Sequence, residues 1–168
     1  MPLVLRRAKP PDADFLLELL GDDDVRQFLG PRTAATRGEV LEEIERSLAE
    51  PGGFGRFVIE ADGERGGMLG FHVVNERSRI ARLERLAVHP AFRGRRLADE
   101  AARLFQRLLL EQLGYHRLEL EIYASNERAC AHADRVGFVR EGRKRQAYRK
   151  DGEWVDTVLY ALIPEDLP

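Results

Sequence analysis

Apolar residues recur along the chain with two different periods. Spacings of three and four residues, which mark one buried face of a helix, predict helices at Phe15–Leu20, Val25–Leu29, Thr36–Ala49, Gly94–Gly114 and Asn126–Val136. Alternation of apolar and polar residues, which marks a half-buried strand, predicts strands at Leu3–Arg7, Arg56–Ala61, Gly67–Asn75, Arg79–Val88, Arg117–Ala124, Phe138–Arg149 and Trp154–Ile163. No repeat or low-complexity linker interrupts the pattern, so we expect one α/β domain over residues 1–168.

The order of the predicted elements indicates a mixed sheet. Strand Arg79–Val88, helix Gly94–Gly114 and strand Arg117–Ala124 form a β–α–β unit, whose two strands are expected to be parallel. The turns DGERG and KDGE favour antiparallel hairpins near the start and at the end of the chain. We therefore predict a central sheet of about seven strands with helices on both faces.

Composition excludes several classes of protein. The chain has 168 residues, a net charge of −2, and 43% apolar and 33% charged residues, values typical of a folded globular domain. It contains no apolar run of about 18 residues, and its N-terminus lacks the apolar segment of a signal peptide. The single cysteine, Cys130, excludes an internal disulfide. We expect a cytoplasmic protein that binds neither membranes nor nucleic acid.

One short segment concentrates positive charge where it is unexpected. The stretch HPAFRGRRLADEA places Arg93, Arg95 and Arg96 at the start of a predicted helix. Free N–H groups already make a helix N-terminus positive, so arginines there repel unless an anion binds. A loop between the end of a strand and the start of a helix is a common phosphate site. The alternative is an arginine-rich surface turn that binds nothing.

Longer motifs resemble the GNAT superfamily of acyl-CoA-dependent N-acyltransferases. The segments that carry the resemblance are LERLAVHPAFRGRRLADEAARLF, LELEIYASNERACAHADRVGFVREG and DGEWVDTVLYALIPED, and they look most like the RimL-type branch, which includes ribosomal-protein N-terminal acetyltransferases. The resemblance implies a GNAT fold in which two parallel strands splay apart. It also implies acetyl-CoA as cosubstrate and a small-molecule amine or a protein N-terminus as acceptor. The oligomeric state stays open between a monomer and a homodimer.

The resemblance assigns cofactor-binding residues. The family signature Q/R-x-x-G-x-G/A falls on Arg93, Gly94, Arg95, Arg96, Leu97 and Ala98, which are expected to hold the pyrophosphate. Arg96 stands where the family usually has glycine, and an arginine is tolerable there if its backbone is right-handed helical and its side chain points outward. Backbone groups of Leu86, Ala87 and Val88 are expected to pair with the amide-rich arm of the cofactor. Asn126 is a good N-cap, and the resemblance adds a contact with the cofactor.

The candidate catalytic residue is Glu84, on the strand that leads into the basic loop. Alternation places Glu84 and Leu86 on one face of this strand, and Leu83 and Arg85 on the other. A carboxylate there can take a proton from the acceptor ammonium, directly or through water. The alternative is a salt bridge from Glu84 to an arginine of a neighbouring strand.

The sequence lacks candidate residues for a general acid and for a metal site. Ala129 and Ala133 stand where relatives often carry a serine and a tyrosine, so no general acid is assigned. The four histidines show no metal-ligand spacing, and no metal is expected.

The sequence therefore predicts an enzyme that moves an acetyl group from acetyl-CoA to a primary amine by direct attack. Two alternatives stay open at this point. One is a non-catalytic acyl-CoA-binding sensor or regulatory module. The other is a phosphate-binding module for a different nucleotide, although no Gly-Lys-Ser/Thr run of a P-loop is present.

Overall fold

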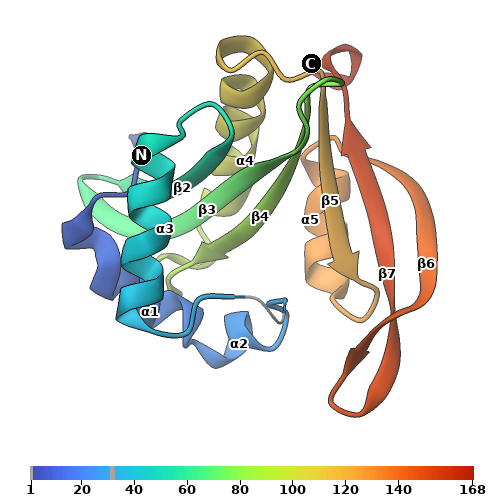
Figure 1. Ribbon diagram of the computed structural model, residues 1–168, viewed down its shortest axis with the longest axis horizontal. Coiled ribbons are helices and arrows are strands. Elements are labelled where there is room, and N and C mark those ends of the chain that lie inside the picture. The colour runs from blue at the N-terminus through green and yellow to red at the C-terminus, as the bar shows by residue number, and fades with distance from the viewer. Residues whose placement is uncertain (1, 31–32) are drawn as a thin grey trace.

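The computed structural model of the protein describes residues 2–30 and 33–168. Within these ranges seven strands form one sheet in the order β1-β2-β3-β4-β5-β7-β6 (Figure 1). Their bounds are β1 Leu3–Arg7, β2 Phe54–Ala61, β3 Glu64–Asn75, β4 Ile80–Val88, β5 Arg117–Tyr123, β6 Val139–Lys150 and β7 Glu153–Leu162. Only β4 and β5 are parallel; the other neighbouring strands are antiparallel. The predicted mixed sheet is confirmed.

Helices cover both faces of this sheet. The α-helices are α1 Ala13–Leu20, α2 Asp23–Arg26, α3 Arg37–Ala49, α4 Leu97–Arg107 and α5 Glu127–Arg135, and η3 Leu108–Gln112 extends α4 as a π-helical turn. The short 3-10 turns are η1 Pro10–Asp12, η2 Pro90–Phe92 and η4 Pro164–Asp166. Apolar residues of α1 and α3 pack in one core with Val58 and Met68 of the sheet. Residues of α4 and α5 pack in a second core with Phe71 and Leu118.

Several element boundaries differ from the sequence prediction, and three of them have a clear local cause or position. The short helix begins at Asp23 rather than Val25, because the Asp22 side chain accepts a hydrogen bond from the Asp24 N–H and caps it. Strand β2 begins at Phe54, two residues before the predicted start at Arg56. The long helix begins at Leu97 rather than Gly94, because the loop before it adopts backbone conformations that cannot continue a helix.

The parallel strands separate soon after they meet. Pairing joins Ile80 to Arg117, Ala81 to Leu118 and Arg82 to Glu119, and ends there. Figure 1 shows β4 turning away from β5 beyond this point. Beyond Arg82, β4 stays paired with β3 on one edge through Leu83, Glu84, Ala87 and Val88, while within the described ranges no strand pairs with the other edge. This confirms the splayed pair and leaves backbone groups of β4 available at that edge.

A β-bulge interrupts β4 inside this unpaired segment. Met68 pairs with Ala87 and Gly70 with Glu84, so Arg85 and Leu86 together lie opposite one residue of β3. Arg85 has a φ of +59°, and a bulge of this kind breaks the alternation of side chains. The prediction that Arg85 and Glu84 lie on opposite faces is therefore wrong, since both side chains reach the face covered by α1 and α3.

Candidate active site

Two residues of the basic loop have a left-handed backbone. Gly94 has a φ of +82° and Arg96 a φ of +57°, and Gly94, Arg95 and Arg96 are all exposed. Arg96 therefore does not have the right-handed backbone that would make an arginine tolerable at this position. Glycine adopts a positive φ without strain, whereas another residue pays about 1–2 kcal/mol, which explains why glycine is usual at this position. Because Arg96 occupies the N-cap of α4 without a capping side-chain bond, the N–H groups of the first turn stay available to an anion.

The three arginines of the loop have different surroundings. Arg93 donates from Nε to the Val88 carbonyl at 3.2 Å, and its Nη atoms lie 3.2 Å from Asp22 and 3.1 Å from Asp24. It therefore ties the loop to α2. The Arg95 guanidinium lies 5.3 Å from the centre of the Phe92 ring. Neither Arg95 nor Arg96 has an acidic side chain within 4 Å among residues 2–30 and 33–168.

The remaining cofactor candidates lie at the same edge of the sheet. Leu86 is half-exposed on the unpaired edge of β4, next to Ala87 and Val88. Asn126 follows the carboxyl end of β5, and its Oδ1 accepts a hydrogen bond from the Ala129 N–H at 3.2 Å, which confirms the N-cap. Parallel strands present their carboxyl ends at one edge, where α/β proteins bind ligands. The structure thus gathers the loop and Asn126 at the edge where β4 and β5 separate.

The predicted catalytic residue, Glu84, is part of a cluster of buried charges. Its Oε1 accepts a hydrogen bond from Arg56 Nη1 at 2.9 Å and lies 3.3 Å from His72 Nδ1. Burial alone would raise the pKa of this carboxyl, but the contact with His72 and the charges of Arg56 and Arg85 outweigh it and lower the pKa to about 2. Glu84 does make the salt bridge of the alternative interpretation; its predicted role as a base is a separate matter and stays a prediction.

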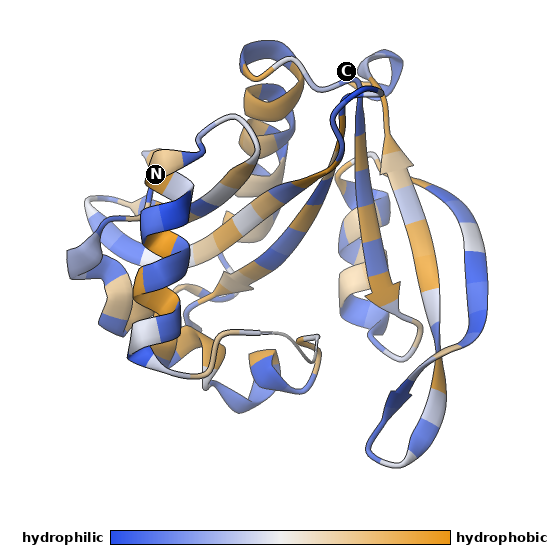
Figure 2. Cartoon of the chain, viewed as in Figure 1, coloured by the Kyte–Doolittle hydropathy of each residue, from blue (hydrophilic) through white to orange (hydrophobic). Residues whose placement is uncertain are grey.

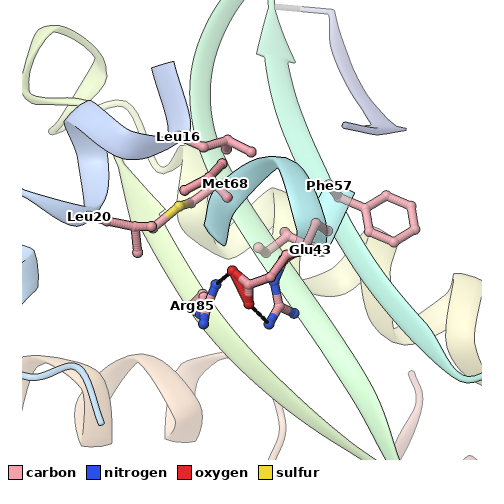
Figure 3. Close-up of a pocket in the computed structure, with 9 residues that line it drawn as sticks. Leu16, Leu20, Glu43, Phe57, Met68 and Arg85 are labelled. Carbon is pink, nitrogen blue, oxygen red and sulfur yellow. Dashed lines mark hydrogen bonds and ion pairs between the residues drawn. The ribbon is translucent and has the colours of Figure 1, made fainter. Parts of the chain in front are cut away.

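Arg56 organises this cluster from β2. Its side chain is only 8% exposed and pairs with Glu84 and, at 2.9 Å, with Glu43 of α3. Figure 3 shows the Glu43 carboxylate between Arg85 and a second guanidinium, which belongs to Arg56, beside the pocket under α1 and α3. The carboxylates of Glu43 and Glu84 thus balance the guanidinium charges of Arg56 and Arg85, so no buried charge is left without a partner.

Sequence reasoning missed Arg56, Glu43 and His72. Gly70, inside β3, was the available signal, because a glycine within a strand often marks a close approach. A Cβ at Gly70 would lie 2.7 Å from Arg56 Nη1 and 2.7 Å from the Gly55 carbonyl oxygen. Gly70 therefore makes room for the buried guanidinium.

Two absences apply to the part of the chain that the structure describes. In that part, no group of three or more His, Cys, Asp or Glu side chains is placed to hold a metal ion. No helix in the same residues is long and apolar enough to cross a membrane.

Comparison with known proteins agrees with this geometry. The family described as "Acetyltransferase (GNAT) domain" matches residues 2–139. The Bacillus subtilis protein named "Putative ribosomal N-acetyltransferase YdaF" is 26% identical over 173 residues, which cover 98% of this chain and 92% of that protein. The fold matches spermidine N-acetyltransferase from Vibrio cholerae, in complex with CoA and spermine, with a TM-score of 0.86 and 20% identity over 98% of this chain and 97% of that one.

A further structural match is RimL, a ribosomal L7/L12 alpha-N-protein acetyltransferase in complex with coenzyme A, with a TM-score of 0.84 and 20% identity over 96% of this chain and 93% of that one. The predicted fold, the acetyl-CoA cosubstrate and the transfer to an amine are confirmed, so neither alternative is retained. The chain belongs to the GNAT acetyltransferase family and is an N-acetyltransferase that moves an acetyl group from acetyl-CoA to an amine.

Proposed function

We propose that the pyrophosphate of acetyl-CoA binds over Gly94–Ala98 at the N-terminus of α4. The uncapped first turn supplies N–H donors, and the exposed side chains of Arg95 and Arg96 supply positive charge. Arg93 contributes mainly by holding the loop, since its guanidinium is already engaged by Asp22 and Asp24. This division of roles among the three arginines is the observation that carries the cofactor assignment.

The arm of the cofactor then follows the unpaired edge of β4. Backbone groups of Leu86, Ala87 and Val88 pair with its amides in the way that one strand pairs with another. Asn126 contacts the cofactor from the neighbouring strand end. The thioester then lies near the bulge at Arg85, because a strand rises about 3.3 Å per residue and Glu84–Val88 spans about 13 Å.

In this proposal the Glu84 carboxylate acts as the base that removes a proton from the acceptor ammonium. It lies two residues beyond the last β4–β5 pair, next to the bulge and on the face opposite α4. A neutral amine attacks the thioester directly, without a covalent enzyme intermediate, and the protein contributes orientation and N–H donors.

The α-amine of a protein N-terminus is the acceptor that the charges favour. Four carboxylates near the strand separation are already paired with arginines: Glu43 and Glu84 with Arg56, and Glu119 and Glu121 with Arg82. A polyamine carries several positive charges and needs several unpaired carboxylates, whereas a protein N-terminus carries one. We also propose that residues 1–168 form a single domain and that the protein is cytoplasmic. In this proposal it binds no nucleic acid and is a monomer or a homodimer.

The test measures CoA affinity and acceptor preference separately. The double variant Arg95→Glu/Arg96→Glu should raise the CoA dissociation constant at least tenfold, since one charge-assisted hydrogen bond contributes about 1.5–3 kcal/mol. Arg77→Glu, at an exposed turn at the other end of β4, is the matched control and should leave CoA binding unchanged.

Thiol release from acetyl-CoA with a panel of amines then identifies the acceptor. A peptide with a free N-terminus should turn over faster than spermidine or an N-blocked lysine peptide. Unchanged CoA affinity in the double variant would contradict the phosphate assignment, and faster turnover of spermidine would contradict the acceptor assignment.

A further inference from the structure

His72 is a titratable side chain beside Glu84 that has no role so far. It lies on β3, where it pairs in register with Arg82, and Gly70 pairs with Glu84 two residues along the same strands. Its side chain is 35% exposed, and its Nδ1 lies 3.3 Å from Glu84 Oε1. Gly70 carries no side chain, so nothing from β3 comes between the imidazole and the carboxylate.

The surroundings of His72 fix which of its nitrogens carries a proton. Arg56 from β2 donates to Glu84 Oε1 at 2.9 Å, and Arg82 from β4 is turned toward Glu119 and Glu121 of β5. Glu43 of α3 is paired with both Arg56 and Arg85, the two arginines next to Glu84. The group that faces Nδ1 is thus an ionised carboxylate, which accepts hydrogen bonds and never donates one. In the neutral ring this contact favours the proton on Nδ1, which leaves the lone pair on Nε2.

Glu84 by itself is a weak base in this setting. Its pKa is lowered to about 2, so it holds a proton poorly at neutral pH. Histidine is the side chain that most often acts as a general base in enzymes. The Glu84 carboxylate is better suited to orienting the His72 ring and stabilising its protonated form. An ionised aspartate has this role beside the histidine of a Ser-His-Asp triad.

We propose that His72 is a catalytic residue, which takes the proton of the acceptor ammonium on Nε2, and that Glu84 positions it through Nδ1. The inference deepens the proposed function, because it rests on the acceptor approaching β4 at the bulge. It changes the role of Glu84 from proton acceptor to positioning residue.

The reaction balances with these groups alone. The ammonium gives one proton to Nε2 of neutral His72 and becomes an amine. The amine nitrogen attacks the thioester carbon, the C–N bond forms, and the C–S bond breaks. The nitrogen then loses its second proton to the departing sulfur, so the products are the N-acetylated amine and the CoA thiol. The proton on His72 passes to water through the exposed edge of the ring, so one proton is released in each turnover.

Kinetics of two histidine variants test the proposal. His72→Gln should lower kcat by about 10²–10⁴-fold, the usual contribution of a general base, and should remove the acid limb of the kcat profile against pH. CoA affinity and melting temperature should stay near those of the unaltered protein, because His72 lies away from the loop. His116→Gln is the matched control at an exposed histidine just before β5, and it should keep both rate and profile.

Two further measurements separate a chemical role from a structural one. His72→Ala should regain activity when imidazole is added, and ¹⁵N NMR of the unaltered protein should show His72 protonated on Nδ1. In Glu84→Gln that tautomer preference should weaken, since the amide oxygen is a poorer acceptor than a carboxylate. An unchanged rate and profile in His72→Gln, or an Nε2-protonated ring, would overturn the inference. If no amine releases thiol although CoA binds, the acceptor proposal fails instead, and the NMR tautomer still decides the His72–Glu84 pair.

Discussion

Two groups of arginines in this protein occupy opposite electrostatic situations. In the strand cluster, formed by Glu43, Arg56, Glu84 and Arg85, every charge faces an opposite charge, and side-chain exposure runs from 8% to 28%. In the loop pair, Arg95 and Arg96, both side chains are exposed and no acidic group of the described chain lies within 4 Å. The protein supplies the counter-charges in the cluster, whereas a bound phosphate can supply them in the loop.

The two groups of arginines therefore have different roles: the strand cluster holds the elements around Glu84 in place, and the loop pair provides affinity for an anion. Charges buried with their partners are fixed in place, and removing one partner leaves the other uncompensated. The cluster therefore holds β2, α3 and the bulge of β4 in a defined arrangement around Glu84. The exposed arginines contribute little to the folded state, so their charge is available to an anion. Figure 2 shows a difference in hydropathy elsewhere in the sheet, where β6 is hydrophilic along most of its length while β7 beside it carries an apolar stretch.

The largest expected effect breaks the cluster. Arg56→Met keeps most of the side-chain length but removes the charge that compensates Glu43 and Glu84. We expect the free energy of unfolding, measured with urea at pH 7, to fall by about 3–5 kcal/mol. Arg46→Met is the matched control, because Arg46 also stacks on Phe54 but is 56% exposed; it should cost less than about 1 kcal/mol. Equal losses of unfolding free energy in the two variants would show that the buried charge pairs of Arg56 do not stabilise the fold more than an exposed arginine does.

Acid should weaken the cluster before it affects the loop. The pKa of Glu84 is lowered from 4.5 to about 2 in the folded protein. A lowered pKa adds stability above the unfolded value and loses it as pH falls from about 4.5 toward about 2. The contribution is at most about 3 kcal/mol, since one pKa unit corresponds to about 1.4 kcal/mol. Glu84→Gln should make the free energy of unfolding less dependent on pH between 5 and 3, and an unchanged dependence would contradict this assignment.

A smaller effect comes from the space that the cluster needs. In Gly70→Ala the new methyl group would meet Arg56 and the Gly55 carbonyl oxygen at 2.7 Å. Overpacking of this kind costs about 1–3 kcal/mol, which urea unfolding can measure. Gly142→Ala on β6 is the control, since a Cβ there meets no atom within 4 Å. If both variants unfold alike, Gly70 is not required by the guanidinium.

The smallest effect sharpens the loop side of the comparison. Arg96→Gly removes a left-handed arginine, so we expect the free energy of unfolding to rise by about 1 kcal/mol. If the guanidinium also binds phosphate, CoA affinity should fall in the same variant, and its dependence on salt should become shallower. Calorimetric titration of CoA at two salt concentrations measures both quantities. Higher stability with unchanged affinity would assign Arg96 to the backbone alone.

The sequence by itself determined the order of the elements and the place of the cofactor loop. Periods of two and of three to four residues are local properties, so all seven strands and the five helices could be located before the structure. The order strand, helix, strand indicated the parallel pair, and the GNAT-like motifs indicated the cosubstrate. Boundaries failed where single residues decided them, as at Asp22 and Arg96, because capping and a positive φ depend on individual backbone angles rather than on periodicity.

Only the tertiary structure decided what surrounds Glu84 and Arg93. Arg56 is 28 residues from Glu84 in the sequence, and Asp22 is 71 residues from Arg93. No local pattern reports contacts over such separations, because they arise when packing brings separate elements together. The bulge at Arg85 likewise broke the alternation from which the faces of β4 were predicted. The sequence therefore predicted which residues lie near the edge where β4 and β5 separate. The fold determined their charge partners, and with them the pKa of Glu84.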